Sequence, residues 1–136
     1  DQGIGWPKIP GDRERNLKQK DESVSMWKEI VKLSESITWP DQKTRDHAIG
    51  SSYYGLRLYE IYRNLIYLDD AEIRGDKAAM KKYLQAYDAA WKVYNKLPQQ
   101  YNELATLYTQ RDNRHIGGHP GSKLKKLRSE FNMTIE

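Results

Sequence analysis

Apolar residues recur at three- and four-residue intervals through most of the chain, which is the spacing of one face of an α-helix. The first such stretch covers residues 21–38 and places Val24, Trp27 and Val31 on one side. Trp39-Pro40 follows it, and proline disfavours helical backbone in the residue before it. We therefore predict a first helix over residues 21–38 that ends just before this dipeptide.

Two further helices are predicted over residues 41–74 and 77–97. Asp41 and Asp76 stand where an N-cap side chain would accept a free backbone N–H, and Gly75 stands at a helix C-terminus. Gly50 and Gly55 interrupt the second pattern. They either weaken the helix or mark the close approach of a neighbouring helix.

The remaining segments predict shorter elements. Residues 99–109 and 122–131 have short helical patterns, and residues 114–122 (RHIGGHPGS) predict a loop. Residues 1–12 hold three Gly and two Pro, so we expect residues 1–20 to be an extended leader that Trp6 anchors. The predicted fold is all-α, an antiparallel bundle of three main helices plus one or two short helices. Its divisions are the leader, a bundle over 21–110, and a basic loop with a terminal helix over 111–136.

Composition adds few constraints on function. The 136 residues include no Cys, which excludes a disulfide scaffold, and no apolar run reaches the roughly 20 residues of a membrane span. The chain opens with Asp1, so we expect it to be processed or excised from a longer polypeptide. Residues 1–20 carry a net charge of +2, residues 21–110 −1 and residues 111–136 +3, so the ends are basic and the body is nearly neutral.

No candidate cluster predicts catalysis, a metal site or a cofactor site. His115 and His119 are four residues apart, but Gly117, Gly118 and Pro120 prevent the helix that would give this spacing its meaning. Four acidic residues surround Gly75, where helix capping and solvation account for them. They are Asp69, Asp70, Glu72 and Asp76.

Two patterns leave alternatives open. KLKKLR (residues 123–128) is either a solvated helix face opposite Leu124 and Leu127 or a surface for phosphates or an acidic protein. A tyrosine recurs at every seventh residue from 87 to 108, and this row is either a core edge or an interface. The basic ends support one function, a small helical adaptor that binds nucleic acid or an acidic protein. Few cations are available, so nucleic acid is the less favoured partner.

Two stretches resemble the helical segments that follow the catalytic barrel in some large secreted bacterial glycoside hydrolases. They are residues 51–63 (SSYYGLRLYEIYR) and 74–109, which contain a Tyr-Gly-Leu-x-Leu-Tyr element and, after a Gly-Asp turn, a Tyr-Asp-x-x-Trp element. The resemblance covers about half the chain and carries no catalytic signature. It implies a non-catalytic, secreted, periplasmic or cell-surface accessory module. Such a module would pack on a catalytic domain of the same or an associated polypeptide, or contact glycan.

Such contacts would use exposed aromatic side chains, because aromatic anchors dominate interface energies and their faces stack on sugars. Trp27 and Trp91 lie on apolar stripes and are expected to be structural. Trp39, at the end of the first helix, is the leading contact candidate. Trp6, Tyr53 and Tyr67 are further candidates.

Overall fold

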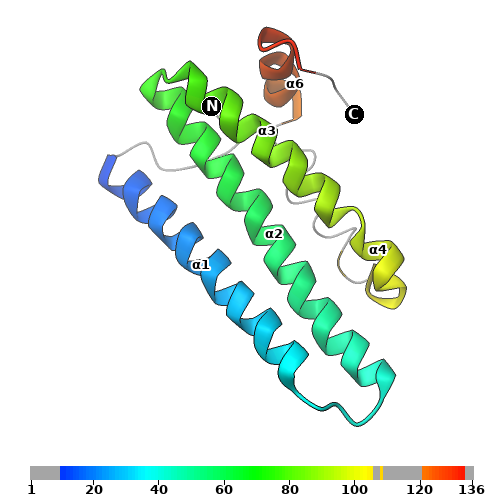
Figure 1. The fold of residues 1–136 in the computed structure, drawn as a ribbon. Helices are drawn as coiled ribbons and strands as arrows, with labels where there is room; N and C mark the ends of the chain where they lie inside the picture. The colour runs from blue at the N-terminus through cyan, green and yellow to red at the C-terminus, as the bar shows by residue number, and fades with distance from the viewer. Residues whose placement is uncertain (1–9, 106–107, 109–120, 134–136) are drawn as a thin grey trace.

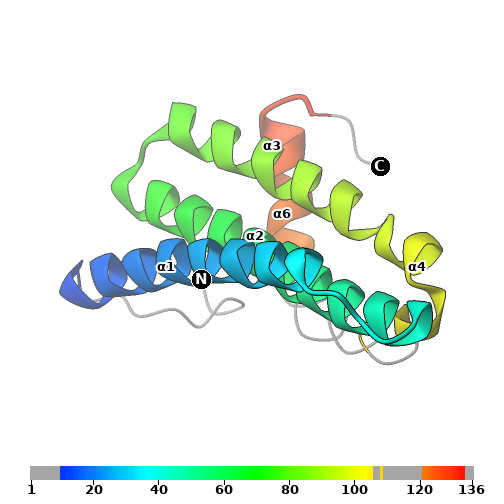
Figure 2. The same cartoon turned by 60° about the horizontal axis from the view of Figure 1, so that its bottom comes forward.

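The computed structural model describes residues 10–105, 108 and 121–133. Its three long helices are α1 (Pro10–Ser36), α2 (Gln42–Arg74) and α3 (Lys77–Tyr94). They run antiparallel, and α2 lies between α1 and α3 (Figures 1 and 2). The short helices are α4 (Leu97–Gln100) and α6 (Gly121–Glu130), and the described residues contain no strand. The predicted all-α bundle of three main helices with short additions is confirmed.

The turns form where local chemistry predicts them. Asp41 adopts an extended backbone, and its Oδ1 accepts from the Thr44 N–H at 2.7 Å, which caps α2. Gly75 ends α2 with φ 70°, a left-handed conformation that glycine adopts without steric cost. Asp76 then caps α3 by accepting from the Ala79 N–H at 3.0 Å. One Gly-Asp pair therefore reverses the chain between α2 and α3.

The predicted start of the first helix is wrong. Residues 10–20 are helical instead of extended, so α1 begins eleven residues before Asp21. Pro10 suits a first helical position because its fixed φ is helical and its missing N–H needs no partner. Residues 13–20 (RERNLKQK) are mostly good helix formers but have no apolar stripe to reveal a helix. This turn of α1 is tied to α2 by a polar contact, Arg13 Nε to Asp70 Oδ1 at 3.5 Å.

The predicted helix over residues 99–109 is also interrupted. α3 ends at Tyr94, and α4 is a single turn with Pro98 near its start. Tyr101 leaves helical geometry (φ −130°, ψ 64°), and residues 102–105 are helical again. The terminal helix α6 lies within one residue of its predicted bounds.

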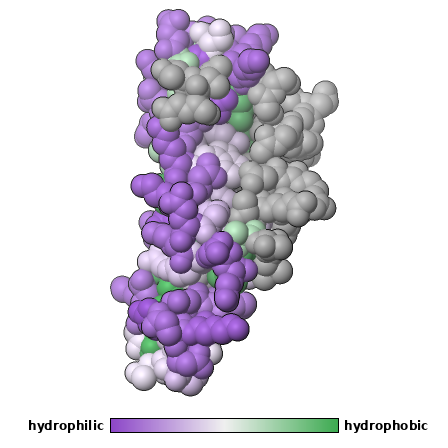
Figure 3. Space-filling model, turned by 90° about the vertical axis from the view of Figure 1, so that its right-hand side faces the viewer, coloured by the Kyte–Doolittle hydropathy of each residue, from purple (hydrophilic) through white to green (hydrophobic). Residues whose placement is uncertain are grey.

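The main core lies between α2 and α3 and extends to α6. Tyr54, Ile61, Leu84 and Tyr94 are its largest fully buried side chains. Leu124 and Leu127 of α6 are buried in the same cluster. All four tyrosines of the seven-residue row belong to this cluster or pack against it, so the row is a core feature: Tyr87, Tyr94, Tyr101 and Tyr108. The described side chains on the face seen in Figure 3 are mostly hydrophilic.

A smaller cluster joins α1 to α2. Val24, Val31 and Leu56 are buried there, and Trp27 packs against them. Ser34 and Ser52 share a buried hydrogen bond of 2.8 Å across the same interface. Trp91 packs on the main core and contacts Tyr94 edge-on. Trp27 and Trp91 are therefore structural, as their stripes predicted.

Candidate binding groove between the long helices

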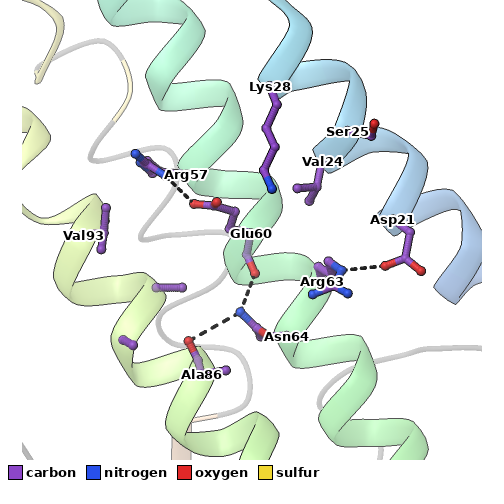
Figure 4. Close-up of a pocket in the computed structure, with 12 residues that line it drawn as sticks. Asp21, Val24, Ser25, Lys28, Arg57, Glu60, Arg63, Asn64, Ala86 and Val93 are labelled. Carbon is purple, nitrogen blue, oxygen red and sulfur yellow. Dashed lines mark hydrogen bonds and ion pairs between the residues drawn. The ribbon is translucent and has the colours of Figure 1, made fainter. Parts of the chain in front are cut away.

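An open groove of about 600 Å³ lies along α2, between α1 and α3. It exists because α1 and α3 each pack on α2 and leave a channel above the central helix. Each helix lines the channel with residues spaced three or four apart, which is one helical face. The lining residues are Asp21, Val24, Ser25 and Lys28 of α1, Arg57, Glu60, Arg63 and Asn64 of α2, and Ala86, Ala89, Ala90 and Val93 of α3 (Figure 4).

One end of the groove is held by a cluster of three polar side chains. Asp21 of α1 accepts from Arg63 Nε at 2.5 Å and from the Tyr67 hydroxyl at 2.7 Å. Burial alone would raise the pKa of Asp21, but these two hydrogen bonds and the Arg63 charge hold that pKa below its usual range. Burial and the hydrogen bond to Asp21 raise the pKa of Tyr67 to about 12. The cluster is therefore an ionised carboxylate held by a cation and a neutral phenol.

The Tyr67 ring has a cation and a second aromatic ring as neighbours. The Arg63 guanidinium lies 4.9 Å from the centre of the ring, and Tyr83 of α3 stacks on it with ring centres 5.0 Å apart. A cation over an aromatic face is attracted by the ring quadrupole. Tyr67 therefore positions Arg63 and links α2 to both neighbouring helices.

A similar arrangement stands further along α2. Arg57 Nη1 donates to Glu60 Oε1 at 2.9 Å, and its guanidinium lies 5.5 Å from the centre of the Tyr53 ring. The Tyr53 hydroxyl donates to Glu35 of α1 at 2.9 Å, and its ring stacks on Tyr101. Burial and the bond to Glu35 raise the pKa of Tyr53. Tyr53 thus holds Arg57 as Tyr67 holds Arg63.

The α3 side of the groove is lined by small, uncharged side chains. Asn64 Nδ2 donates to the carbonyl of Glu60 at 3.0 Å and to that of Ala86 at 3.4 Å, which connects α2 to α3. Beyond it, α3 presents Ala86, Ala89 and Val93. Short side chains on this wall leave the groove open.

The predicted contact residues are placed differently from one another. Tyr53 and Tyr67 do not line the groove but contact residues that do: Tyr53 contacts Arg57, and Tyr67 contacts Arg63 and Asp21. Both rings also stack on another tyrosine. Trp39 does not line the groove. It is half-buried after α1, and its Nε1 donates to the Ser34 carbonyl at 2.8 Å.

Several predictions fall outside the described residues or are accounted for by the structure. Trp6, His115 and His119 lie in segments that are not described. In the acidic cluster, Asp70 pairs with Arg74 at 2.8 Å and Asp76 caps α3. Asp69 is only 3% exposed, so the prediction that solvation accounts for it is wrong. Among the described residues, no three His, Asp or Glu side chains are arranged to hold a metal ion.

The basic stretch in α6 has a structural use. Arg128 forms two hydrogen bonds to Asp88 of α3, at 2.6 and 3.0 Å, and these hold α6 on the bundle. The bond to Asp88 also raises the pKa of Arg128. Lys125 and Lys126 are exposed while Leu124 and Leu127 are buried. Of the two alternatives for residues 123–128, these positions favour a solvated helix face over a surface that binds phosphates or an acidic protein.

Comparison with family models, with curated proteins and with solved structures finds no significant match. In the described part of the chain, no helix combines the length and apolar character needed to cross a bilayer.

The groove residues could not be identified from the sequence. Arg57 and Glu60 are three apart, a common pairing on any helix surface. Asp21 and Arg63 are 42 residues apart and meet only when α1 packs on α2. No sequence pattern marked Lys28 or Asn64.

Proposed function

We propose that this chain is a non-catalytic helical accessory module of a carbohydrate-active, glycoside hydrolase-like protein, and that the groove contacts glycan. The resemblance of residues 51–63 and 74–109 to helical segments behind a catalytic barrel supports the class. The groove supports the contact, because its volume lies within the range of small-ligand sites.

The observation that carries the proposal is the set of polar groups in the groove, which come from different helices and are held in place. Arg57 and Arg63 are each fixed by a carboxylate and a tyrosine ring. A sugar ring is covered with hydroxyl groups, and preorganised donors and acceptors bind such a surface at low entropic cost. The tyrosines contribute by holding the arginines, since their own ring faces are occupied.

The same geometry supports a binding role over catalysis. A carboxyl group that acts as a general acid near neutral pH needs a raised pKa. The pKa of Asp21 is lowered instead, and Glu60 is paired with Arg57. Both carboxylates of the groove therefore act as acceptors that orient the arginines.

A second surface supports contact with a catalytic domain of the same or an associated polypeptide. Met26 and Leu33 of α1 are 60% and 61% exposed, and Ile37, the residue after α1, is 49% exposed. Exposed apolar side chains that gather on one surface are typical of an interaction site, and these three are our candidates for one. This partner and a secreted, periplasmic or cell-surface location belong to the same proposal.

The groove can be tested by filling it. Ala89 is exposed on the α3 wall, so Ala89→Phe should block the channel without disturbing the core. Ala78→Phe is the matched control on the same helix outside the groove. We expect calorimetric titration with neutral and acidic oligosaccharides to show binding that Ala89→Phe removes and Ala78→Phe leaves intact.

Two results would count against the proposal. One is the absence of binding to every oligosaccharide, which would remove the glycan contact. The other is cleavage of chromogenic glycosides by the purified chain, with activity lost on changing Asp21 or Glu60, which would remove the non-catalytic role.

A further inference from the structure

We propose that the groove selects an acidic oligosaccharide, one whose sugars carry carboxylate groups, and that Lys28 and Arg63 bind a carboxylate of that glycan. This inference rests on the proposed glycan contact and goes beyond it by naming the ligand class. The charges and free hydrogen-bonding atoms of the groove carry it.

The two carboxylates in the groove are already neutralised. Asp21 is paired with Arg63 at 2.5 Å, and Glu60 is paired with Arg57 at 2.9 Å. These pairs leave Lys28 as an additional cation in the lining. Lys28 is exposed and forms neither a hydrogen bond nor an ion pair with another described residue. In Figure 4 its side chain extends from α1 toward α2.

The arginines also keep free donors. A guanidinium has five N–H donors in a fixed planar fork. Arg63 uses Nε for Asp21, and its two terminal nitrogens donate no hydrogen bond within the described part of the chain. A planar carboxylate matches such a fork and strengthens each bond by its charge. Arg63 of α2 and Lys28 of α1 both line the groove and both keep free donors, so the carboxylate is assigned to them.

The rest of the lining suits an uncharged sugar ring. The Ser25 hydroxyl and Asn64 Oδ1 have no hydrogen-bond partner among the described residues, and they match the hydroxyl groups of a sugar. Ala86, Ala89 and Val93 add an apolar wall for the C–H face of the ring.

The charge balance favours an acidic glycan over nucleic acid. The lining holds three cations and two carboxylates, so its excess positive charge is small. A nucleic-acid backbone carries one charge per nucleotide and is bound by clusters of cations.

The test compares short oligogalacturonates with the same oligosaccharides after methyl esterification, which removes the charge and keeps the sugar. Calorimetric titration of the full chain at physiological salt should show the acid binding about tenfold more tightly than the ester, a difference of roughly 1.4 kcal/mol. Lys28→Gln should remove most of that preference. Lys81→Gln is the matched control, since Lys81 is exposed on α3 outside the groove.

The outcomes separate the inference from the proposed function. Equal binding of acid and ester would overturn the acidic preference while glycan contact stands. An acid preference that survives Lys28→Gln would overturn the assigned site. Binding of neither form would overturn the inference, and failure with other neutral oligosaccharides as well would remove the glycan contact.

Discussion

The indole ring of Trp27 occupies the space where a side chain at Gly55 would begin. A Cβ built on Gly55 would lie 2.6 Å from Trp27 Cε3, closer than side-chain carbons pack. Trp27 also stacks on Tyr59 of α2, with ring centres 6.3 Å apart. The absence of a side chain at Gly55 therefore allows α1, the helix that carries Asp21, to pack closely on α2.

We expect Gly55→Ala to destabilise the protein. Alanine in place of a helical glycine normally stabilises by about 1 kcal/mol. Here the added methyl group meets a rigid ring, and such overpacking costs about 1–3 kcal/mol. Urea unfolding should show a net loss of stability. In a Trp27→Leu background the ring is gone, so the same change should be neutral or stabilising. If Gly55→Ala stabilises the otherwise unchanged protein, the indole moves aside and close packing is not required.

A second prediction concerns the attachment of α6. Arg128 and Asp88 are largely shielded from solvent, at 17% and 28% side-chain exposure, and share two hydrogen bonds. Hydrogen bonds to charged groups contribute about 1.5–3 kcal/mol. Arg128→Ala should therefore loosen α6, and hydrogen exchange of residues 121–130 should accelerate while α1 stays protected.

Lys125→Ala and Lys126→Ala are the controls, because both side chains are exposed on the same helix. They should leave exchange in α6 unchanged. Tight duplex binding at physiological salt that these two changes abolish would instead support the nucleic-acid adaptor and contradict a purely structural role for the basic stretch.

Burial and the hydrogen bond to Asp21 raise the pKa of Tyr67, and this shift predicts a pH dependence of stability. The pKa of Tyr67 is about 12 in the folded chain, above its ordinary value near 10. A raised tyrosine pKa contributes stability below pH 10, because the folded state holds its proton more tightly than the unfolded state. That contribution is lost as pH rises from about 10 to 12.

Tyr67→Phe should flatten this alkaline loss in denaturant titrations at several pH values. Tyr59→Phe is the control, since the Tyr59 hydroxyl donates no hydrogen bond within the described residues. If Tyr67→Phe loses stability between pH 10 and 12 as the unchanged protein does, the raised pKa of Tyr67 is contradicted.

The pKa of Asp21 is lowered, so the stability that Asp21 contributes is present above the unfolded pKa of about 4 and disappears as pH falls through the lower, folded value. Asp21→Asn should flatten that loss of stability at acid pH.

The fold was largely predictable because its signals are local. Asp41, Gly75 and Asp76 each act on backbone groups within a few residues, so their positions in the sequence fix the helix ends. The early start of α1 was missed because its first turns have no apolar stripe. Arg13 meets Asp70 there, a residue 57 positions later in the sequence.

The groove was not predictable for a related reason. Its aromatic residues were noticed, but Tyr53 and Tyr67 were expected to offer free ring faces. Arg57 instead lies over the Tyr53 ring, which also stacks on Tyr101, and Arg63 lies over the Tyr67 ring, which also stacks on Tyr83. Which side chain covers a ring depends on the tertiary packing of three helices. A sequence pattern shows only that a tyrosine is present.

The last prediction separates a structural tryptophan from a contact tryptophan. Trp91 packs on the main core and meets Tyr94 edge-on with ring centres 5.2 Å apart. Trp91→Ala should therefore cost about 3 kcal/mol, the lower end of the range for large core truncations, because the ring is half-buried. Trp39 belongs to neither core cluster, and its best contact is the single hydrogen bond to the Ser34 carbonyl.

Trp39→Ala should cost only about 1 kcal/mol, the net contribution of one hydrogen bond. It should weaken binding to a partner domain, since Trp39 follows the end of α1 where Leu33 and Ile37 are exposed. It should leave oligosaccharide binding unchanged, because Trp39 does not line the groove. Thermal unfolding of both variants checks the stability order, and titration with oligosaccharide checks the groove. If Trp39→Ala unfolds the domain while Trp91→Ala remains stable, the structural and contact roles are reversed, and the proposed surface on α1 is wrong.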